Sequence, residues 1–297
     1  PSVAYRINDQ LSIGAGLNVQ YIDATLSSMV DLVPLLGAAA AGMPSTPDTD
    51  VFSEITADDW SFGFNVGLIY ELSQTSRVGL AYRSEVQHDL KGDAEFTIQN
   101  PSGLQAIPVP VAGNLFNLAA ATFSDQGASG GIDLPAVASL SLYHEVTPAL
   151  AILADITWTE WSTFDKLVIN FDGTLQPKPS ETTENWDDTW RYSLGATYQA
   201  TEALKLRTGV AYDETPIPDE YRTPRIPGED RLWLSLGAGY QFTENLSMDV
   251  AYAHLFVDDS KMEKTATPGT EDAGRGTVIG EFENSVDIAS LQLSYSF

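Results

Sequence analysis

The sequence predicts an all-β fold, a transmembrane antiparallel β-barrel. Apolar and polar residues alternate with period two through most of the 297 residues, which is typical of strands with two unlike faces. No segment approaches the roughly 18 apolar residues that a membrane-spanning helix needs. The best candidate, 32–43, is too short and contains Pro34. Short and long connections also alternate along the chain, as they do in outer-membrane barrels.

Composition narrows the class of protein further. There are 41 acidic residues against 15 Lys plus Arg, a formal charge of −26, and no cysteine. This balance argues against binding to nucleic acid or to an anionic membrane surface. Without cysteine there are no disulfides and no thiolate metal sites. We expect no metal and no cofactor.

Eleven segments carry the strand pattern. In the segment 60–72, for example, one face holds Trp60, Phe62 and Phe64, and the other holds Ser61 and Gly63. A soluble β-sandwich is the alternative, but glycine on its wet face would weaken the strands. In a barrel the apolar face meets lipid, and Tyr and Trp near the strand ends form interfacial girdles. The expected strands are 3–7, 11–21, 60–72, 78–86, 139–142, 152–158, 190–198, 204–212, 232–242, 246–256 and 291–297.

The connections give an orientation. Short turns near 8–10, 73–76, 146–149, 200–203 and 243–245 alternate with long segments near 28–50, 97–135, 172–185, 213–230 and 258–278. If the terminal Phe297 ends at the periplasmic rim, all five short turns are periplasmic and the long loops are extracellular.

The two ends of the chain give one prediction about the last strand and one about the extent of the barrel. The alternation of the final strand fails at Asp287, which predicts a bulge or an early exit from the lipid there. The chain starts at Pro1 without a signal peptide, and eleven is an odd number where bacterial single-chain barrels have even counts. We expect residues 1–297 to be the C-terminal part of a single barrel domain.

Two long loops are apolar where porin loops are typically polar. Residues 29–44 include an expected short helix over Leu32–Ala41, and residues 104–122 include an apolar patch over Leu115–Ala121. Exposed apolar surface usually marks a binding site. The loops either form a groove for lipophilic molecules or cover each other. A third loop, 213–231, holds four prolines and alternating charges that indicate a local salt-bridge lattice.

Several segments carry a family resemblance. GVAYDETPIPDEYRTPRIPGEDRLWLSLG (209–237) closely resembles the FadL/TodX family of outer-membrane transporters, and so do PSVAYRINDQLSIGAGLNVQY, WSFGFNVGLIYEL, LAYRSEVQHDLKGDAEF and WDDTWRYSLGATYQ. The resemblance implies a 14-stranded barrel in the outer membrane of a Gram-negative bacterium, about eleven strands of which are present here. It also implies an N-terminal hatch, which would be missing together with the first three strands.

The resemblance and the alternation together suggest binding residues. By analogy the apolar loops form the family's outer groove, lined by Leu32, Val33, Leu35, Leu36, Leu115, Phe116 and Leu118. In the lumen the family holds a fatty carboxylate with basic side chains, one of which would correspond to Lys178. A second basic position of the family falls at 23–28, where this sequence has no Arg or Lys. By alternation Arg191, Arg207, Arg231 and Trp233 face the lumen, although lumenal arginines also pair with neighbours such as Asp213 and Asp249.

These observations predict uptake of hydrophobic compounds, long-chain fatty acids first, through an apolar extracellular groove and a lumenal pocket. Aromatic hydrocarbons within the same family and a general aqueous porin are the alternatives. No enzyme is expected, because His88, His144 and His254 all share the lipid-facing alternation and leave no Ser–His pair inside. The expected partners are the hydrophobic ligand, outer-membrane lipid and lipopolysaccharide, and the barrel-assembly machinery through Phe297. We expect a monomer.

Overall fold

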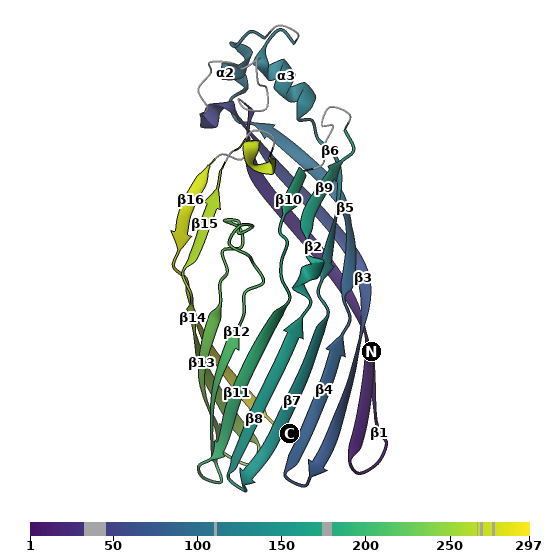
Figure 1. The fold of residues 1–297 in the computed structure, drawn as a ribbon, viewed down its shortest axis with the longest axis vertical. Coiled ribbons are helices and arrows are strands. Elements are labelled where there is room, and N and C mark those ends of the chain that lie inside the picture. The colour runs from purple at the N-terminus through teal and green to yellow at the C-terminus, as the bar shows by residue number, and fades with distance from the viewer. Residues whose placement is uncertain (33–45, 110–111, 174–179, 266, 268–269, 275–276) are drawn as a thin grey trace.

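A sheet of fifteen antiparallel strands forms most of the molecule (Figure 1). The computed structural model describes residues 1–297 except 33–45, 110–111, 174–179, 266, 268–269 and 275–276. Eleven strands lie side by side in the barrel wall: β1 (Ser2–Arg6), β2 (Leu11–Asp31), β3 (Asp50–Ser73), β4 (Ser76–Arg83), β7 (Val137–Thr147), β8 (Leu150–Thr159), β11 (Thr189–Gln199), β12 (Leu204–Asp213), β13 (Arg231–Gln241), β14 (Leu246–Val257) and β17 (Ser285–Tyr295). In the described part, β1 pairs with β2 alone and β17 with β14 alone, so this wall has two free edges.

The remaining strands of the sheet extend this wall at the extracellular end. β2 and β3 run on beyond the barrel, and four further strands join them: β5 (Val86–Ile98), β6 (Gln126–Leu134), β9 (Lys166–Phe171) and β10 (Ser180–Thr183). We call this extension the upper sheet; in Figure 1 it rises above β4, β7 and β8.

Short elements complete the extracellular end. Helices α2 (Pro101–Gln105) and α3 (Leu115–Thr122) lie at its tip (Figure 1). The hairpin of β15 (Ser260–Lys264) and β16 (Val278–Phe282) lies below them, above β13 and β14 (Figure 1). Short 3-10 turns occur at Pro47–Thr49, Trp161–Thr163 and Glu271–Gly274. Asn114 begins α3, since its side-chain oxygen accepts a hydrogen bond from the Asn117 N–H at 2.9 Å. In the described residues no helix is long and apolar enough to span a membrane.

The predicted strands and turns are present. All eleven expected strands occur, and the five short turns join β1–β2, β3–β4, β7–β8, β11–β12 and β13–β14 at one end. The expectation of a long irregular segment at 97–135 is wrong in part, because β6 occupies Gln126–Leu134 and pairs with β5 along most of its length. β10 likewise lies within the long segment expected at 172–185, and β9 is a strand between 158 and 172 that the alternation does not predict.

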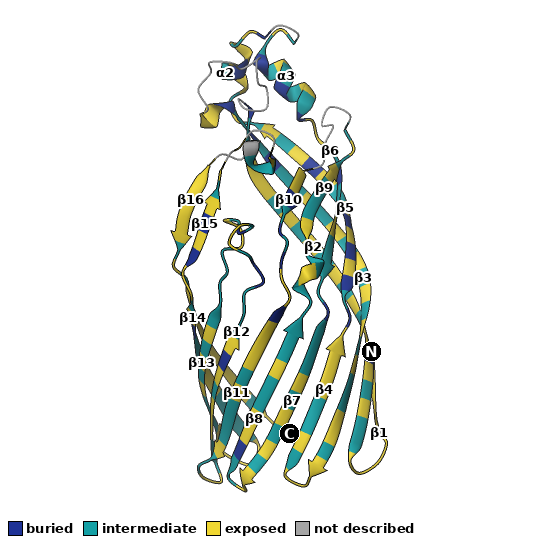
Figure 2. Cartoon of the chain, viewed as in Figure 1, coloured by how far each residue is buried: buried dark blue, intermediate teal, exposed yellow. Residues whose placement is uncertain are grey.

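The two faces of the strands differ as predicted over most of the wall. Leucine and aromatic side chains of the outward faces are widely exposed on the molecule and meet lipid in the membrane. Figure 2 shows the resulting alternation of exposed and less exposed residues along β4, β7 and β8.

One strand reverses its faces, and here the prediction is wrong. Asn65 of β3 pairs with Arg83, whereas Asp58 pairs with Lys91. Seven steps on β3 therefore stand opposite eight on β4–β5, and the extra residue flips the alternation. Val86 and His88 consequently face the interior instead of the lipid, and His88 is 1% exposed.

The final strand has no bulge. β17 pairs with β14 without a register shift from Ser285 to Tyr295, so Asp287 stays on the outward face opposite His254. The Asp287 carboxylate lies 2.7 Å from Nδ1 of His254 and accepts a hydrogen bond from the Tyr252 hydroxyl at 2.5 Å. Of the two expected explanations, only an early exit from the lipid remains.

Candidate functional site

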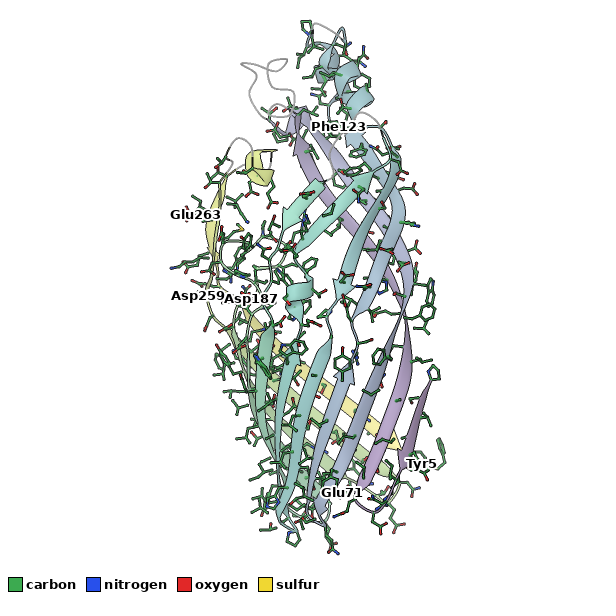
Figure 3. The ribbon with its side chains drawn as sticks, turned by 45° about the vertical axis from the view of Figure 1, so that its right-hand side comes forward. Tyr5, Glu71, Phe123, Asp187, Asp259 and Glu263 are labelled. Atoms are coloured by element: carbon green, nitrogen blue, oxygen red, sulfur yellow. The ribbon has the colours of Figure 1, made fainter. Side chains whose placement is uncertain are left out.

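An apolar cluster closes the extracellular tip. Its members come from the end of β2, the start of β3, the α2–α3 segment and the residue after α3, and each is at most 6% exposed: Leu32, Val51, Leu104, Val109, Leu115, Ala119 and Phe123. Phe116 and Leu118 of α3 pack against it from the side. Figure 3 places Phe123 at this end and Glu71 at the opposite end of the barrel.

The predicted groove residues fall into three groups here. Leu32 and Leu115 are fully buried in the cluster, so the two apolar loops cover each other at these positions. Phe116 and Leu118 are half-buried. Val33, Leu35 and Leu36 lie outside the described residues. A ligand can therefore reach Leu32 or Leu115 only where the two loops part.

The upper sheet carries apolar rows on its inner face, above the Asp59–His88 pair, and many charges on its outer face. Cross-strand register puts Leu26, Ile55 and Ala94 in one inner row, with Ala24, Ala57 and Gly92 in the next. The outer face carries Asp23, Glu54, Asp58, Lys91, Asp93 and Glu95. The inner rows lead from the tip toward the barrel.

Aromatic rings join the cluster to this inner face. Phe96 of β5 lies 5.6 Å from Phe123 and 6.2 Å from Phe171 of β9, measured between ring centroids. Phe171 pairs with Ala128, which in turn pairs with Gly92. The apolar surface therefore continues from the extracellular cluster down the inner face of the upper sheet.

A histidine–aspartate pair lies at the lower end of this face. Nδ1 of His88 is 3.0 Å from Oδ2 of Asp59, and the His88 side chain is fully buried. Its Nε2 has no hydrogen-bond partner within the described residues. Nearby in the fold, Gly127–Gly131 matches G-x-S-x-G, but Ser129 lies inside strand β6 and not at the strand-to-helix turn that a nucleophile elbow requires.

The barrel lumen holds a cavity of about 560 Å³. Seven strands line it, and much of the lining is small: Gly79, Ser141, Ser193, Gly195, Gly209, Ala211 and Ser235. Trp233 of β13 lines it as well, and the Trp233 indole N–H has no hydrogen-bond partner in the described part of the chain. The guanidinium of Arg191 stacks over the Trp233 ring, 5.0 Å from its centroid.

The predicted lumenal arginines divide into paired and unpaired ones. Arg207 forms an ion pair with Asp249 at 2.7 Å, and Arg231 one with Asp213 at 3.4 Å. Arg191 has no carboxylate partner among the residues described. Lys178 lies outside the described residues. The structure thus brings Arg191 and Trp233 together in one cavity and engages Arg207 and Arg231 elsewhere.

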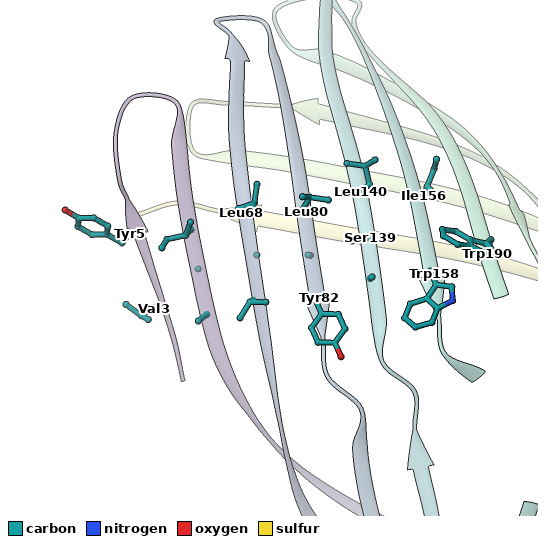
Figure 4. Close-up of a pocket in the computed structure, with 17 residues that line it drawn as sticks. Val3, Tyr5, Leu68, Leu80, Tyr82, Ser139, Leu140, Ile156, Trp158 and Trp190 are labelled. Carbon is teal, nitrogen blue, oxygen red and sulfur yellow. The ribbon is translucent and has the colours of Figure 1, made fainter. Parts of the chain in front are cut away.

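A second hollow, of about 1100 Å³, lies on the outer face of the wall (Figure 4). Its lining includes Tyr82, Trp158 and Trp190, with Ala15 and Ala138 in the same cross-strand row. Because the two alanine side chains are small, they leave a hollow between the larger side chains. Because these side chains have the lipid-facing alternation, this hollow contacts the membrane and is not part of the path through the barrel.

The proline-rich loop forms the predicted salt-bridge lattice, centred on a fully buried arginine, Arg222. Its guanidinium pairs with the carboxylates of Asp219 and Glu229. It also donates to three carbonyl oxygens, those of Ile217, Gly228 and Lys261. All five N–H groups of the guanidinium thus have an acceptor, and the loop is fastened to β15.

A buried carboxyl lies beside an aromatic cluster in the neighbouring loop. The ring of Trp186 packs edge-on against Trp161 and Phe164, and its N–H donates to Glu184 at 3.1 Å. Burial raises the pKa of Glu184, which is 5% exposed, and the Trp186 hydrogen bond offsets this only in part. The ionised form of Glu184 is therefore disfavoured in the folded loop.

Replacing Glu184 by glutamine is expected to stabilise this loop at neutral pH. The folded pKa lies above the unfolded one, so ionisation costs stability once the pH rises above about 4.3, and the cost is absent below that value. We expect Glu184→Gln to raise the loop's thermal transition by about 2 °C at pH 7.5 and to leave it unchanged at pH 3.5. Tryptophan fluorescence against temperature measures this. The exposed Glu220→Gln is the control, and an equal effect at both pH values would contradict the assignment.

Comparison with known proteins gives a consistent result. A family model described as outer membrane protein transport protein (OMPP1/FadL/TodX) matches residues 1–297. A long-chain fatty acid transport protein of Escherichia coli O6:H1 is 33% identical over the whole of this chain. The chain spans 65% of that relative's length.

Solved structures agree with the family match. A FadL homologue of Pseudomonas aeruginosa superposes with a TM-score of 0.83 at 29% identity, covering 99% of this chain and 66% of that one. A monoaromatic hydrocarbon channel, CymD, gives a TM-score of 0.62 at 25% identity, covering 86% of this chain and 67% of that one. Relatives named for fatty acids and for aromatic hydrocarbons therefore share this fold.

Proposed function

Because the chain belongs to the OMPP1/FadL/TodX family of outer-membrane transport proteins, we propose that it takes up hydrophobic compounds, long-chain fatty acids first. The protein is a transmembrane β-barrel of the Gram-negative outer membrane, and its family consists of transport proteins rather than enzymes. In the proposed path a ligand enters between the apolar extracellular loops, follows the inner face of the upper sheet and reaches the lumenal cavity.

The continuous apolar inner face is the observation that carries this proposal. Transfer of apolar surface out of water is worth about 25 cal/mol per Å², and no reacting group is needed. The inner rows through Leu26, Ile55 and Ala94 carry no charge, whereas the opposite face of the same strands is densely charged. A general aqueous porin does not need such a lining, because a polar solute gains no binding free energy from contact with an apolar surface.

The lumenal cavity favours fatty acids over neutral hydrocarbons. Arg191 forms no ion pair in the described residues and stacks over Trp233, in a cavity that Asp155 also lines. A guanidinium suits the carboxylate end of a fatty acid. A toluene-like ligand would leave the guanidinium unused, so aromatic hydrocarbon transport is the alternative. Growth of a deletion strain on oleate or on an alkylbenzene, each rescued by the full-length gene, distinguishes the two substrates.

The other predicted residues take different roles in this proposal. Phe116 and Leu118 form the apolar surface that the ligand meets first, and they pack against the cluster in which Leu32 and Leu115 are fully buried. Arg207 and Arg231 are proposed to hold neighbouring strands together through Asp249 and Asp213. Outward side chains contact lipid and lipopolysaccharide. The exposed ring of Phe297, packed edge-on against Tyr295 at 5.1 Å, is proposed to be read by the assembly machinery, and the protein to work as a monomer.

A charge on the inner face of the upper sheet is expected to block transport. Ala57→Asp places a carboxylate in the proposed path, where a hydrophobic chain would have to remove its water. We expect oleate uptake to fall about 10-fold, the equivalent of about 1.4 kcal/mol. Labelled oleate uptake by cells that carry the full-length variant measures this.

Thr56→Asp is the matched control, since Thr56 is the neighbouring residue on the exposed outer face of β3. It adds the same charge to the same strand and is expected to leave uptake unchanged. Equal uptake in both variants at equal surface levels would mean that the ligand does not follow this face.

A further inference from the structure

The extracellular wall is built from two separate sheets. In the described part β10 is the edge of the upper sheet and pairs with β9 alone, and the β15–β16 hairpin is a two-stranded sheet of its own. The hairpin and the upper sheet stand on opposite sides of the extracellular end, with the proline-rich loop between them (Figure 1). We propose that the hairpin and this loop form a lid over the path along the upper sheet, held closed by the Glu271 carboxylate. The proposal rests on the proposed function and adds a gate to the same path.

Both strands of the hairpin leave the barrel wall at the same level. The last pair of the wall here is Phe256 with Ser285. The first pair of the hairpin is Ser260 with Phe282. On each strand two residues between the sheets belong to no strand: 258–259 and 283–284. Two such breaks opposite each other form a hinge, because no ladder hydrogen bonds resist bending there.

The hairpin and the proline-rich loop are joined into one body. Three side chains each donate to a backbone carbonyl of the other element at 2.9 Å: Ser260 to Pro227, Arg222 to Lys261, and Lys264 to Glu220. Ser260 and Arg222 are fully buried in this contact, and Met262 of β15 is 3% exposed. The lid therefore moves as a unit.

The tip of the lid is fastened to the edge of the upper sheet. Oε2 of Glu271 accepts hydrogen bonds from the backbone N–H of Thr183 at 3.0 Å and from its hydroxyl at 3.1 Å. Thr183 is the last residue of β10. Nearer the barrel, the Asp187 N–H donates to the Pro216 carbonyl at 2.9 Å. One carboxylate oxygen thus closes the joint at the top, while its base is held by backbone.

Charges of the lid lie against the same end of β10. Burial raises the pKa of Glu184, and the hydrogen bond from Trp186 lowers it. Arg225 and Lys264 of the lid lower this pKa further, whereas Glu271 raises it. The lid therefore brings both attraction and repulsion to the strand end at which Thr183 lies. Such a balance suits a joint that closes and still opens for a ligand.

Bridging the joint in the full-length protein tests the lid. Residues 1–297 contain no cysteine, so Thr183→Cys with Glu271→Cys adds a pair that a short bis-methanethiosulfonate can bridge and a reducing agent can release. We expect bridging to lower uptake of labelled oleate by cells about 10-fold and reduction to restore it. Glu263→Cys with Ile279→Cys is the control, because these residues pair within the hairpin and their bridge leaves the joint free. Uptake that stays unchanged when positions 183 and 271 are bridged would overturn the proposal.

Labelling of the inner face gives a readout that does not depend on transport. A thiol introduced by Ile55→Cys reacts faster with a bulky maleimide when the lid is open. We expect Glu271→Ala to raise this rate about 3-fold, and Glu271→Gln, which keeps an acceptor oxygen, to raise it less. Glu263→Ala, which removes an exposed carboxylate from β15, should leave the rate unchanged.

Heat-modifiable migration on gels verifies that each variant is assembled. An unchanged labelling rate in Glu271→Ala, or an equal rise in Glu263→Ala, would contradict a clasp at Glu271. If the wild type takes up no oleate, the proposed function fails, and the labelling rates still decide whether the lid exists.

Discussion

Replacing Leu194 by arginine is expected to prevent assembly of the barrel. Leu194 lies midway between Trp190 and Tyr198 on the lipid-facing side of β11 and is 54% exposed on the molecule. These aromatic residues mark the two interfaces, so position 194 is at the middle of the membrane. A guanidinium there costs about 2–4 kcal/mol, against 0–1 near the interfaces. We expect the heat-modifiable, folded band to be largely lost.

The neighbouring residue provides a matched control. Ser193 lines the lumenal cavity, so Ser193→Arg adds the same group to the same strand on the wet side. It should assemble as the wild type does, and Leu194→Met should as well. If Ser193→Arg failed to assemble and Leu194→Arg succeeded, the inner and outer faces of the wall would be exchanged.

The barrel wall tolerates a charge on its lumenal face but not on its lipid-facing side, and this difference explains why so many of its strands could be predicted. Lipid excludes charge from every second residue, so each strand of the barrel carries its orientation in its own sequence. The turns follow from the same pattern, since each is a short polar gap between two alternating segments. Eleven strands and five periplasmic turns therefore required no knowledge of contacts between distant residues.

The pattern fails where both faces accept apolar residues. Val86, His88 and Leu90 continue the spacing of Val78, Leu80 and Tyr82, yet the extra residue at Ser84–Glu85 turns them inward. Above the girdles the outer face meets water and the inner face meets the ligand path, so an apolar residue no longer signals lipid. Only the pairing with β3 shows the reversal.

The site could be predicted only in part for a related reason. Alternation places Arg77 on the same face as Gly79 and so in the lumen, as it does Arg191, Arg207 and Arg231. Which of these four has a carboxylate partner depends on register across strands, since Asp249 lies 42 residues from Arg207. Periodicity finds lumenal cations but cannot distinguish a structural ion pair from a free guanidinium.

Replacing Arg222 by methionine is expected to release the proline-rich loop from the extracellular surface. The change removes the guanidinium from five acceptors, including the carboxylate of Glu229, and of these the Gly228 carbonyl oxygen keeps the Thr215 hydroxyl as a donor. Removing one partner of a buried ion pair costs about 3–5 kcal/mol. That is enough to open this loop locally while the barrel, whose stability comes from its strands, stays assembled. Limited proteolysis of whole cells should show new cleavage within 213–230.

The pH dependence of this variant makes the test specific. Burial already raises the pKa of Glu229, and the nearby Arg222 counteracts that effect. Without the arginine the ionised form is disfavoured further, so the cost appears above the unfolded pKa of about 4.3 and disappears below it. Cleavage should be faster at pH 7.5 than at pH 4, where the three carbonyl oxygens have still lost the guanidinium, and adding Glu229→Gln should slow it at pH 7.5. Arg225→Met, which removes an exposed arginine from the same loop, should be cleaved as the wild type is. Rapid cleavage of Arg225→Met as well would assign the effect to loop charge and not to the buried pair, because only Arg222 is enclosed by its acceptors.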